Sequence, residues 1–172
     1  MKKLNLRIFV LTAALFLSLT GCGRVQDKIA EKATEGIVEK ATGGQVDITK
    51  DGVKVQKDGA NFETGKDLKW PKEAMGDLPE PKAKITAVLN AEAGKGGSVA
   101  YNGMSLEDAK AYAAKLKELG YKGGLSISDA DLVSHNGTNS SDASVMFTYN
   151  VGPNEGGITY TPAGAKNATE SN

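Results

Sequence analysis

The chain has 172 residues, with 21 Lys and Arg against 21 Asp and Glu, one Cys and one His. A single cysteine excludes a disulfide framework within the chain, and a single histidine argues against a histidine-rich metal site. Three of the basic residues lie in the first 21 positions, which hold no acidic residue, so the rest of the chain has a net charge of −3. That balance argues against a nucleic-acid-binding protein, which needs an excess of Lys and Arg.

The N-terminus has the layout of an export signal. Basic residues at positions 2, 3 and 7 precede an apolar run over residues 8–19. A run of this length is too short for a bilayer core of about 30 Å, which takes about 20 helical residues. It does fit the hydrophobic region of a secretory signal peptide. We therefore predict that residues 1–21 are a signal peptide.

The segment that ends the apolar run, Leu19-Thr20-Gly21-Cys22, resembles the lipobox of bacterial lipoprotein precursors. The resemblance implies cleavage between Gly21 and Cys22 and a diacylglyceryl thioether on Cys22. Two acyl chains, at about 0.8 kcal/mol per buried methylene, make a stable anchor, whereas one chain gives only marginal binding. The expected location is the outer face of a bacterial cell membrane, with membrane lipid as the first partner.

Residues 22–44 are predicted to carry the anchor and to form a stalk helix, with a small packing helix as the alternative. Apolar residues recur at every fourth position over residues 25–41, which is the narrow stripe of a helix with one packing side. Gly43 and Gly44 are expected to end this helix, because glycine adopts the left-handed backbone that terminates helices.

The next two segments differ in character. Residues 45–64 alternate apolar and polar positions, with Asp-Gly pairs at 51–52 and 58–59, and this pattern predicts a small β-meander. Residues 65–82 contain three prolines among glycines and charged side chains. Because proline fixes φ and lacks an N–H, we predict an extended connection there.

Residues 83–160 are predicted to form the main domain, with a disordered polar tail over residues 161–172. Four runs alternate apolar and polar residues as half-buried strands do: residues 84–92, 98–102, 125–128 and 145–151. An amphipathic helix with Ser105 as its N-cap and Gly120 at its end separates the two pairs of strands. We expect a polar loop over residues 135–142 and a short edge strand over residues 158–160.

The predicted fold class is therefore α+β. An N-terminal helix and a small β-meander precede an antiparallel sheet of the order strand, strand, helix, strand, strand. The amphipathic helix is the only strong cover for that sheet, so it is expected to pack on one face and to leave the other face for a ligand or for the meander.

A second resemblance covers residues 68–151. It is carried by short motifs: Trp70-Pro71, Leu78-Pro79, Tyr112, Leu116-Lys117 and Gly120-Tyr121. Together they resemble a domain of unknown function that recurs in lipoproteins of clostridia and their relatives. The resemblance implies placement outside the cytoplasm and supports the domain boundaries. It carries no known active residues.

Few side chains are arranged for catalysis. His135 lies near Asp131 and Asp142 in the sequence, but no nucleophile motif such as G-x-S-x-G accompanies them. Asp129 and Asp131 lack the further oxygen ligands of a calcium loop. The glycine-rich turn at residues 94–97 is not followed by a Ser or Thr that opens a helix, so it fails as a phosphate loop. We predict no catalytic site, no metal site and no cofactor.

The aromatic residues suggest a binding surface instead. Most of those after the signal segment are Tyr or Trp, which suit interfaces. Trp70, Tyr112 and Tyr121 are the candidates, although tyrosines at such positions also serve as core residues. The predicted function is a lipid-anchored binding or interaction module of the cell envelope, whose partner is an envelope protein or a small ligand. An envelope hydrolase using loop carboxylates and His135, and a structural spacer, are the alternatives.

Overall fold

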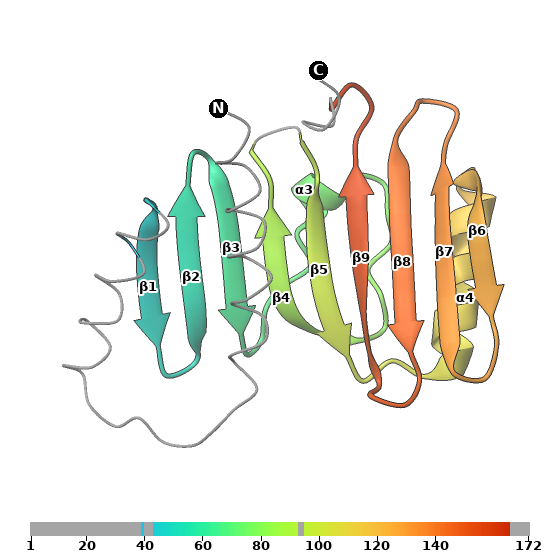
Figure 1. Ribbon diagram of the computed structural model, residues 1–172, viewed down its shortest axis with the longest axis horizontal. Coiled ribbons are helices and arrows are strands. Elements are labelled where there is room, and N and C mark those ends of the chain that lie inside the picture. Colours follow the sequence, from blue (N-terminus) through green and yellow to red (C-terminus); the bar gives the residue numbers. More distant parts are fainter. Residues whose placement is uncertain (1–38, 40–42, 93–94, 166–172) are drawn as a thin grey trace, which may run out of the picture. The chain divides into compact units, whose positions relative to one another are not determined.

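The framework of the structure is one nine-stranded sheet in which every neighbouring pair of strands is antiparallel (Figure 1). The computed structural model describes residue 39, residues 43–92 and residues 95–165, all within one compact unit of the chain. The predicted signal peptide, most of the predicted stalk helix and most of the predicted tail lie outside the described residues.

The described elements are nine strands, one helix of four residues and one helix of 13 residues. The strands are β1 (Gln45–Thr49), β2 (Gly52–Lys57), β3 (Ala60–Gly65), β4 (Lys84–Asn90), β5 (Gly97–Asn102), β6 (Lys122–Ser128), β7 (Leu132–Thr138), β8 (Ser144–Asn150) and β9 (Glu155–Thr161). The helices are α3 (Lys72–Met75) and α4 (Leu106–Glu118). The spatial order of the strands is β1-β2-β3-β4-β5-β9-β8-β7-β6.

The chain builds this order in two passes. The strands β1 to β5 follow one another across the sheet, and α4 then carries the chain to the far edge, where β6 begins. The strands β7, β8 and β9 return towards the middle, so that β9 pairs with β5 and closes the sheet, with Val99 opposite Ile158. The helix α4 begins as predicted, because the Ser105 hydroxyl accepts the N–H of Asp108 at 3.0 Å.

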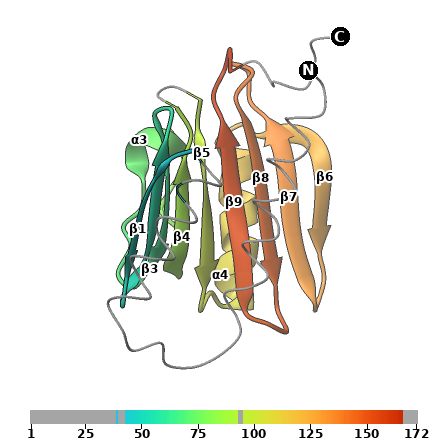
Figure 2. The same ribbon diagram turned by 60° about the vertical axis from the view of Figure 1, so that its left-hand side comes forward.

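Both helices lie on one face of the sheet, which we call the back face because they stand behind the strands in Figure 1 and α4 does so again in Figure 2. Side chains between α4 and the sheet form the core. Phe147 is at its centre, with its ring 4.9 Å from that of Tyr112 and stacked with that of Tyr101 at 6.3 Å. Leu116 of α4 and Val133 of β7 are fully buried beside them.

On the opposite face, the front face, side-chain character changes along the sheet. One row of directly paired residues crosses eight strands: Val46, Val55, Phe62, Leu89, Ser98, Thr159, Met146 and Asn136. The row is apolar on β1 to β4 and mostly polar beyond. On the back face the order is reversed. Lys54 and Glu63 lie there on β2 and β3, and the apolar core lies behind β5, β9, β8 and β7. The changeover falls on β4, where Ala87 and Val88, on opposite faces, are both buried.

The observed architecture corrects the predicted α+β class, since the described chain is mainly β. The predicted meander over residues 45–64 and the predicted domain over residues 83–160 are not separate sheets, because β3 pairs with β4. The predicted extended connection over residues 65–82 contains the short helix α3.

Two strands differ from their predictions. The predicted polar loop over residues 135–142 is largely strand β7 and its turn into β8, because Val133, His135 and Gly137 point to the core while polar residues alternate with them. The predicted edge strand over residues 158–160 is the central strand β9. Its glycines suggest a weak strand, but Gly156 leaves the space in which the Tyr101 side chain lies.

Candidate functional site: a polar hollow on the front face

Of the three aromatic residues predicted as candidates for a binding surface, Tyr112 and Tyr121 lie in the core and Trp70 packs against it. Tyr121 is 0% exposed and Tyr112 is 7% exposed, and Trp70 is half-buried against the same core. The Tyr112 hydroxyl donates to the Pro79 carbonyl at 2.8 Å, and the Tyr121 hydroxyl donates to Asp77 Oδ1 at 2.7 Å. Both hydroxyls thus find acceptors in the connection before β4, which allows the two rings to be buried and ties that connection to the core.

These buried tyrosines predict a loss of stability at alkaline pH. Burial raises the pKa of Tyr101, Tyr112 and Tyr121, and the Asp77 carboxylate adds to the effect at Tyr121. The unfolded chain ionises them near pH 10, so their contribution is fully present below that pH and falls as the pH rises above it. We expect a loss of about 1.4 kcal/mol per pH unit for each tyrosine above pH 10, measured as urea midpoints at pH 8 and pH 11.

A Tyr112→Phe variant is the control for that prediction. It removes one of the three phenols, so its free energy of unfolding should depend less steeply on pH above 10 than that of the wild type. Equal slopes for the two proteins would contradict the assignment to buried tyrosines.

The residues of the predicted hydrolase alternative do not come together. His135 lies in β7 rather than in a loop, is 2% exposed, and places Nε2 2.9 Å from the Tyr121 carbonyl oxygen. Asp131 precedes β7 and Asp142 follows it, at opposite ends of a seven-residue strand that is about 20 Å long. Asp129 is occupied locally, because its Oδ1 accepts the N–H groups of Asp131 and Leu132. These backbone hydrogen bonds lower the pKa of the Asp129 carboxyl.

Within the described residues, no group of three or more His, Cys, Asp and Glu side chains is placed to hold a metal ion. In the same part of the chain, no helix is long and apolar enough to cross a membrane. The Lys95 ammonium of the glycine-rich turn pairs with the Glu92 carboxylate, which is a local ion pair of that turn.

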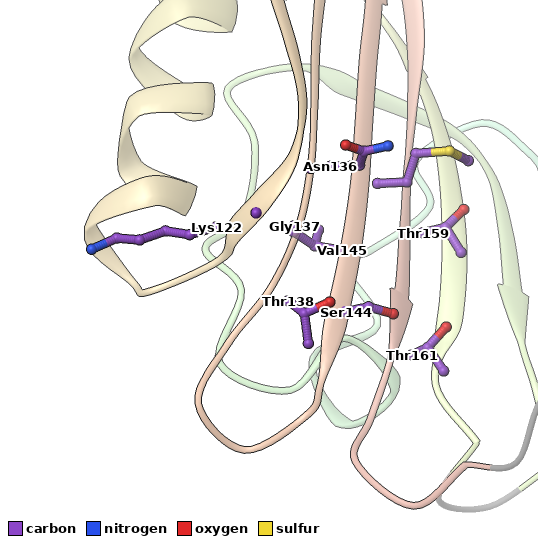
Figure 3. Close-up of a pocket in the computed structure, with 11 residues that line it drawn as sticks. Lys122, Asn136, Gly137, Thr138, Ser144, Val145, Thr159 and Thr161 are labelled. Carbon is purple, nitrogen blue, oxygen red and sulfur yellow. The ribbon is translucent and has the colours of Figure 1, made fainter.

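The front face carries a hollow of about 530 Å³ at the ends of β6 to β9 (Figure 3). It is lined by Lys122, Gly123, Gly124, Asn136, Gly137, Thr138, Ser144, Val145, Met146, Thr159 and Thr161. Strand register places Thr138, Ser144 and Thr161 in one row across β7, β8 and β9. Adjacent strands lie about 4.8 Å apart, so this row spaces three hydroxyl-bearing side chains at short, regular intervals.

Glycines at the edge of the sheet help to shape the hollow. The pairing of β6 with β7 is irregular between Gly123 and Ser126, and Gly123 has a left-handed backbone with φ +88°. A Cβ atom on Gly124 would lie 2.2 Å from Asn136 Oδ1, so only glycine lets β6 approach β7 here. Because glycine has no side chain, Gly123 and Gly124 leave open the space that the hydroxyl groups border.

The hollow is close to neutral and rich in hydrogen-bonding groups. Of the described residues that line it, Lys122 alone is charged, and its side chain extends away from the other labelled residues in Figure 3. Among the described residues, the Thr159 hydroxyl has a side-chain partner, Ser98 Oγ at 3.0 Å, whereas those of Thr138, Ser144 and Thr161 have none. Met146, 53% exposed, adds one apolar contact. The described lining residues can bind a neutral polar molecule, and none of their hydroxyls lies beside a side chain that could act as a base.

The sequence prediction missed this site. The alternation of Ser and Thr with apolar residues in 144–150 and 157–161 is visible in the sequence, but by itself it predicts only strands. Which strands are neighbours decides whether their hydroxyls converge, and that is a property of the tertiary structure.

The chain matches no protein-family model, and no curated protein and no solved structure is found to be similar to it. A proposal for its function therefore has to be based on the chemistry of its own residues.

Proposed function

We propose that this protein is a lipid-anchored binding module on the outer face of a bacterial cell membrane, and that its front-face hollow binds neutral, hydroxyl-rich glycan of the cell envelope. The lipobox-like Leu19-Thr20-Gly21-Cys22 supports the anchor. Residues 22–44 are then the segment between lipid and sheet.

The observation that carries the ligand class is the row formed by Thr138, Ser144 and Thr161. Three neighbouring hydroxyls without side-chain partners in the described residues can each donate and accept hydrogen bonds. A charged ligand calls for charge-assisted partners such as Arg or carboxylate. Among the lining residues that the structure describes, the one charged side chain is Lys122, which points outward. A neutral glycan matches the hydroxyl and amide groups present.

The expected affinity for a short glycan is low. Each neutral hydrogen bond contributes about 1 kcal/mol, so a few of them give a dissociation constant of the order of millimolar. A lipid-anchored protein beside a polymeric glycan gains from repeated contacts and a high local concentration, so weak single sites suffice.

The binding proposal predicts which side chains weaken binding when changed. With a tetramer of N-acetylglucosamine as the probe, Ser144→Ala should bind about fivefold more weakly, because one hydrogen bond of about 1 kcal/mol is lost. NMR titration of the protein measures both the affinity and the backbone signals that move. The matched control is Ser134→Ala on β7, which changes the same kind of residue on the same face outside the hollow lining.

Two outcomes would overturn the binding proposal. One is the absence of any probe-dependent shift at β7, β8 and β9 in the wild-type protein. The other is an equal loss of affinity in Ser134→Ala and Ser144→Ala.

The anchor is tested separately. In cells, the wild-type protein should incorporate labelled palmitate and sediment with membranes, and Cys22→Ala should do neither, because the thioether needs the Cys22 sulfur. A Cys22→Ala protein that still sedimented with membranes and carried the label would refute lipidation at this residue.

A further inference from the structure

Beside the row of hydroxyls in the hollow runs a second row of different chemistry. Strand register places Asn136 opposite Met146 and Met146 opposite Thr159, across β7, β8 and β9. Each of these residues lies two positions along its strand from a member of the hydroxyl row, which is about 7 Å on the same face. The second row therefore places an amide next to a thioether, within reach of a ligand held by the hydroxyls.

The side chain of Asn136 is poorly suited to a strand that has neighbours on both sides. Asparagine is depleted in strands, and Oδ1 of Asn136 is buried without a hydrogen-bond partner among the described residues. A buried polar atom without a partner costs stability, so packing does not account for an asparagine at this position. A role in binding does account for it, because the residue lines the hollow.

The glycine at position 124 leaves room for one end of that amide. Asn136 Oδ1 lies beside Gly124, where a Cβ atom would come within 2.2 Å of it. In Figure 3 the amide nitrogen lies on the other side, away from Lys122. The Asn136 side chain thus turns its oxygen to β6 and keeps its N–H donors for the hollow.

Met146 supplies an apolar surface next to these donors. Its side chain is 53% exposed. Because Met146 is directly paired with Asn136, the Cβ atoms of the two residues lie about 5 Å apart. A thioether side chain is flexible and polarisable, so it adapts to small apolar groups. A ligand group that matches this pair joins a hydrogen-bond acceptor to a small apolar group.

An acetamido group has this composition, because its carbonyl oxygen and its methyl group are bonded to the same carbon atom. We propose, building on the glycan binding proposed for the hollow, that the hollow selects sugars that carry an acetamido substituent. Asn136 Nδ2 donates to the acetamido carbonyl, and Met146 packs on the methyl group. The row of Thr138, Ser144 and Thr161 binds hydroxyls of the sugar rings. A sugar that carries only hydroxyls leaves the thioether without an apolar partner.

The test compares a tetramer of N-acetylglucosamine with a tetramer of glucose that has the same linkage and lacks the acetamido groups. NMR titration of the full chain should show at least about tenfold tighter binding of the first, because a hydrogen bond and a buried methyl group are gained. Met146→Ala should lower that preference to about threefold, since the methyl contact is lost. The matched control is Leu125→Ala, which truncates another exposed apolar side chain, outside the hollow lining, and should keep the full preference.

Asn136→Ala is the second variant and should also lower the preference to about threefold. Unchanged backbone signals of β6 and β8 show that the sheet is intact in each variant. Equal affinity of the wild type for the two tetramers would overturn the selectivity and leave glycan binding standing. A full preference in Met146→Ala or Asn136→Ala, or an equal loss in Leu125→Ala, would do the same. The absence of shifts at β7, β8 and β9 with either tetramer would overturn both proposals.

Discussion

Replacing Phe147 by alanine is expected to lower the free energy of unfolding by about 4 kcal/mol, because a fully buried aromatic side chain is lost from a close-packed core. Phe147 is 0% exposed on the strand β8, with the rings of Tyr101 and Tyr112 packed against it. Its removal exposes a cavity between α4 and the sheet. Urea unfolding followed by circular dichroism measures the change.

The matched control for Phe147→Ala is Leu125→Ala on the edge strand β6. The Leu125 side chain is 62% exposed, so its truncation should change the free energy of unfolding by less than about 0.5 kcal/mol. If the two variants lose similar amounts of stability, Phe147 is not at the centre of the core.

Gly156→Ala is expected to cost about 3 kcal/mol, the upper part of the range for overpacking a well-packed core. A Cβ atom at position 156 would lie 2.2 Å from the Thr148 carbonyl oxygen and 2.4 Å from the Tyr101 hydroxyl oxygen. The Tyr101 hydroxyl donates to that same carbonyl at 2.9 Å, so the added methyl group also disrupts this hydrogen bond. The midpoint of thermal or urea unfolding reports the loss.

The control for Gly156→Ala is Gly152→Ala in the turn between β8 and β9. A Cβ atom there meets no atom within 4 Å, and we expect almost no change in stability. A neutral Gly156→Ala variant would mean that β9 does not lie directly beneath Tyr101, and the central position of β9 would then be in question.

Elements that depend on nearby residues were predicted well. The helix over residues 105–120 is α4, because its start is a hydrogen bond between Ser105 and Asp108 and its apolar stripe repeats within the helix itself. The strands around the Asp51-Gly52 turn were predicted for the same reason. In both cases the decisive interactions join residues a few positions apart.

Elements that depend on distant partners were not predicted. The strand β7 is rich in polar residues and resembles a loop, but it is held on both sides by β6 and β8. The strand β9 has two glycines and resembles an edge, yet Gly156 lies under a tyrosine from β5. Neither relation is visible in the local pattern, because the partners lie tens of residues away along the chain.

For the candidate site too, the features set by nearby residues could be predicted and those set by distant partners could not. The sequence by itself determined the net charge, the lipobox-like segment, the alternation of Ser and Thr along the strands, and the amphipathic helix. Only the tertiary structure decided that Ser98 and Thr159, 61 residues apart, share a hydrogen bond beside the hollow, and that Tyr112 and Tyr121 belong to the core. The physical reason is that alternation assigns a residue to one side of its strand, whereas the order of the strands decides which residues meet on that side.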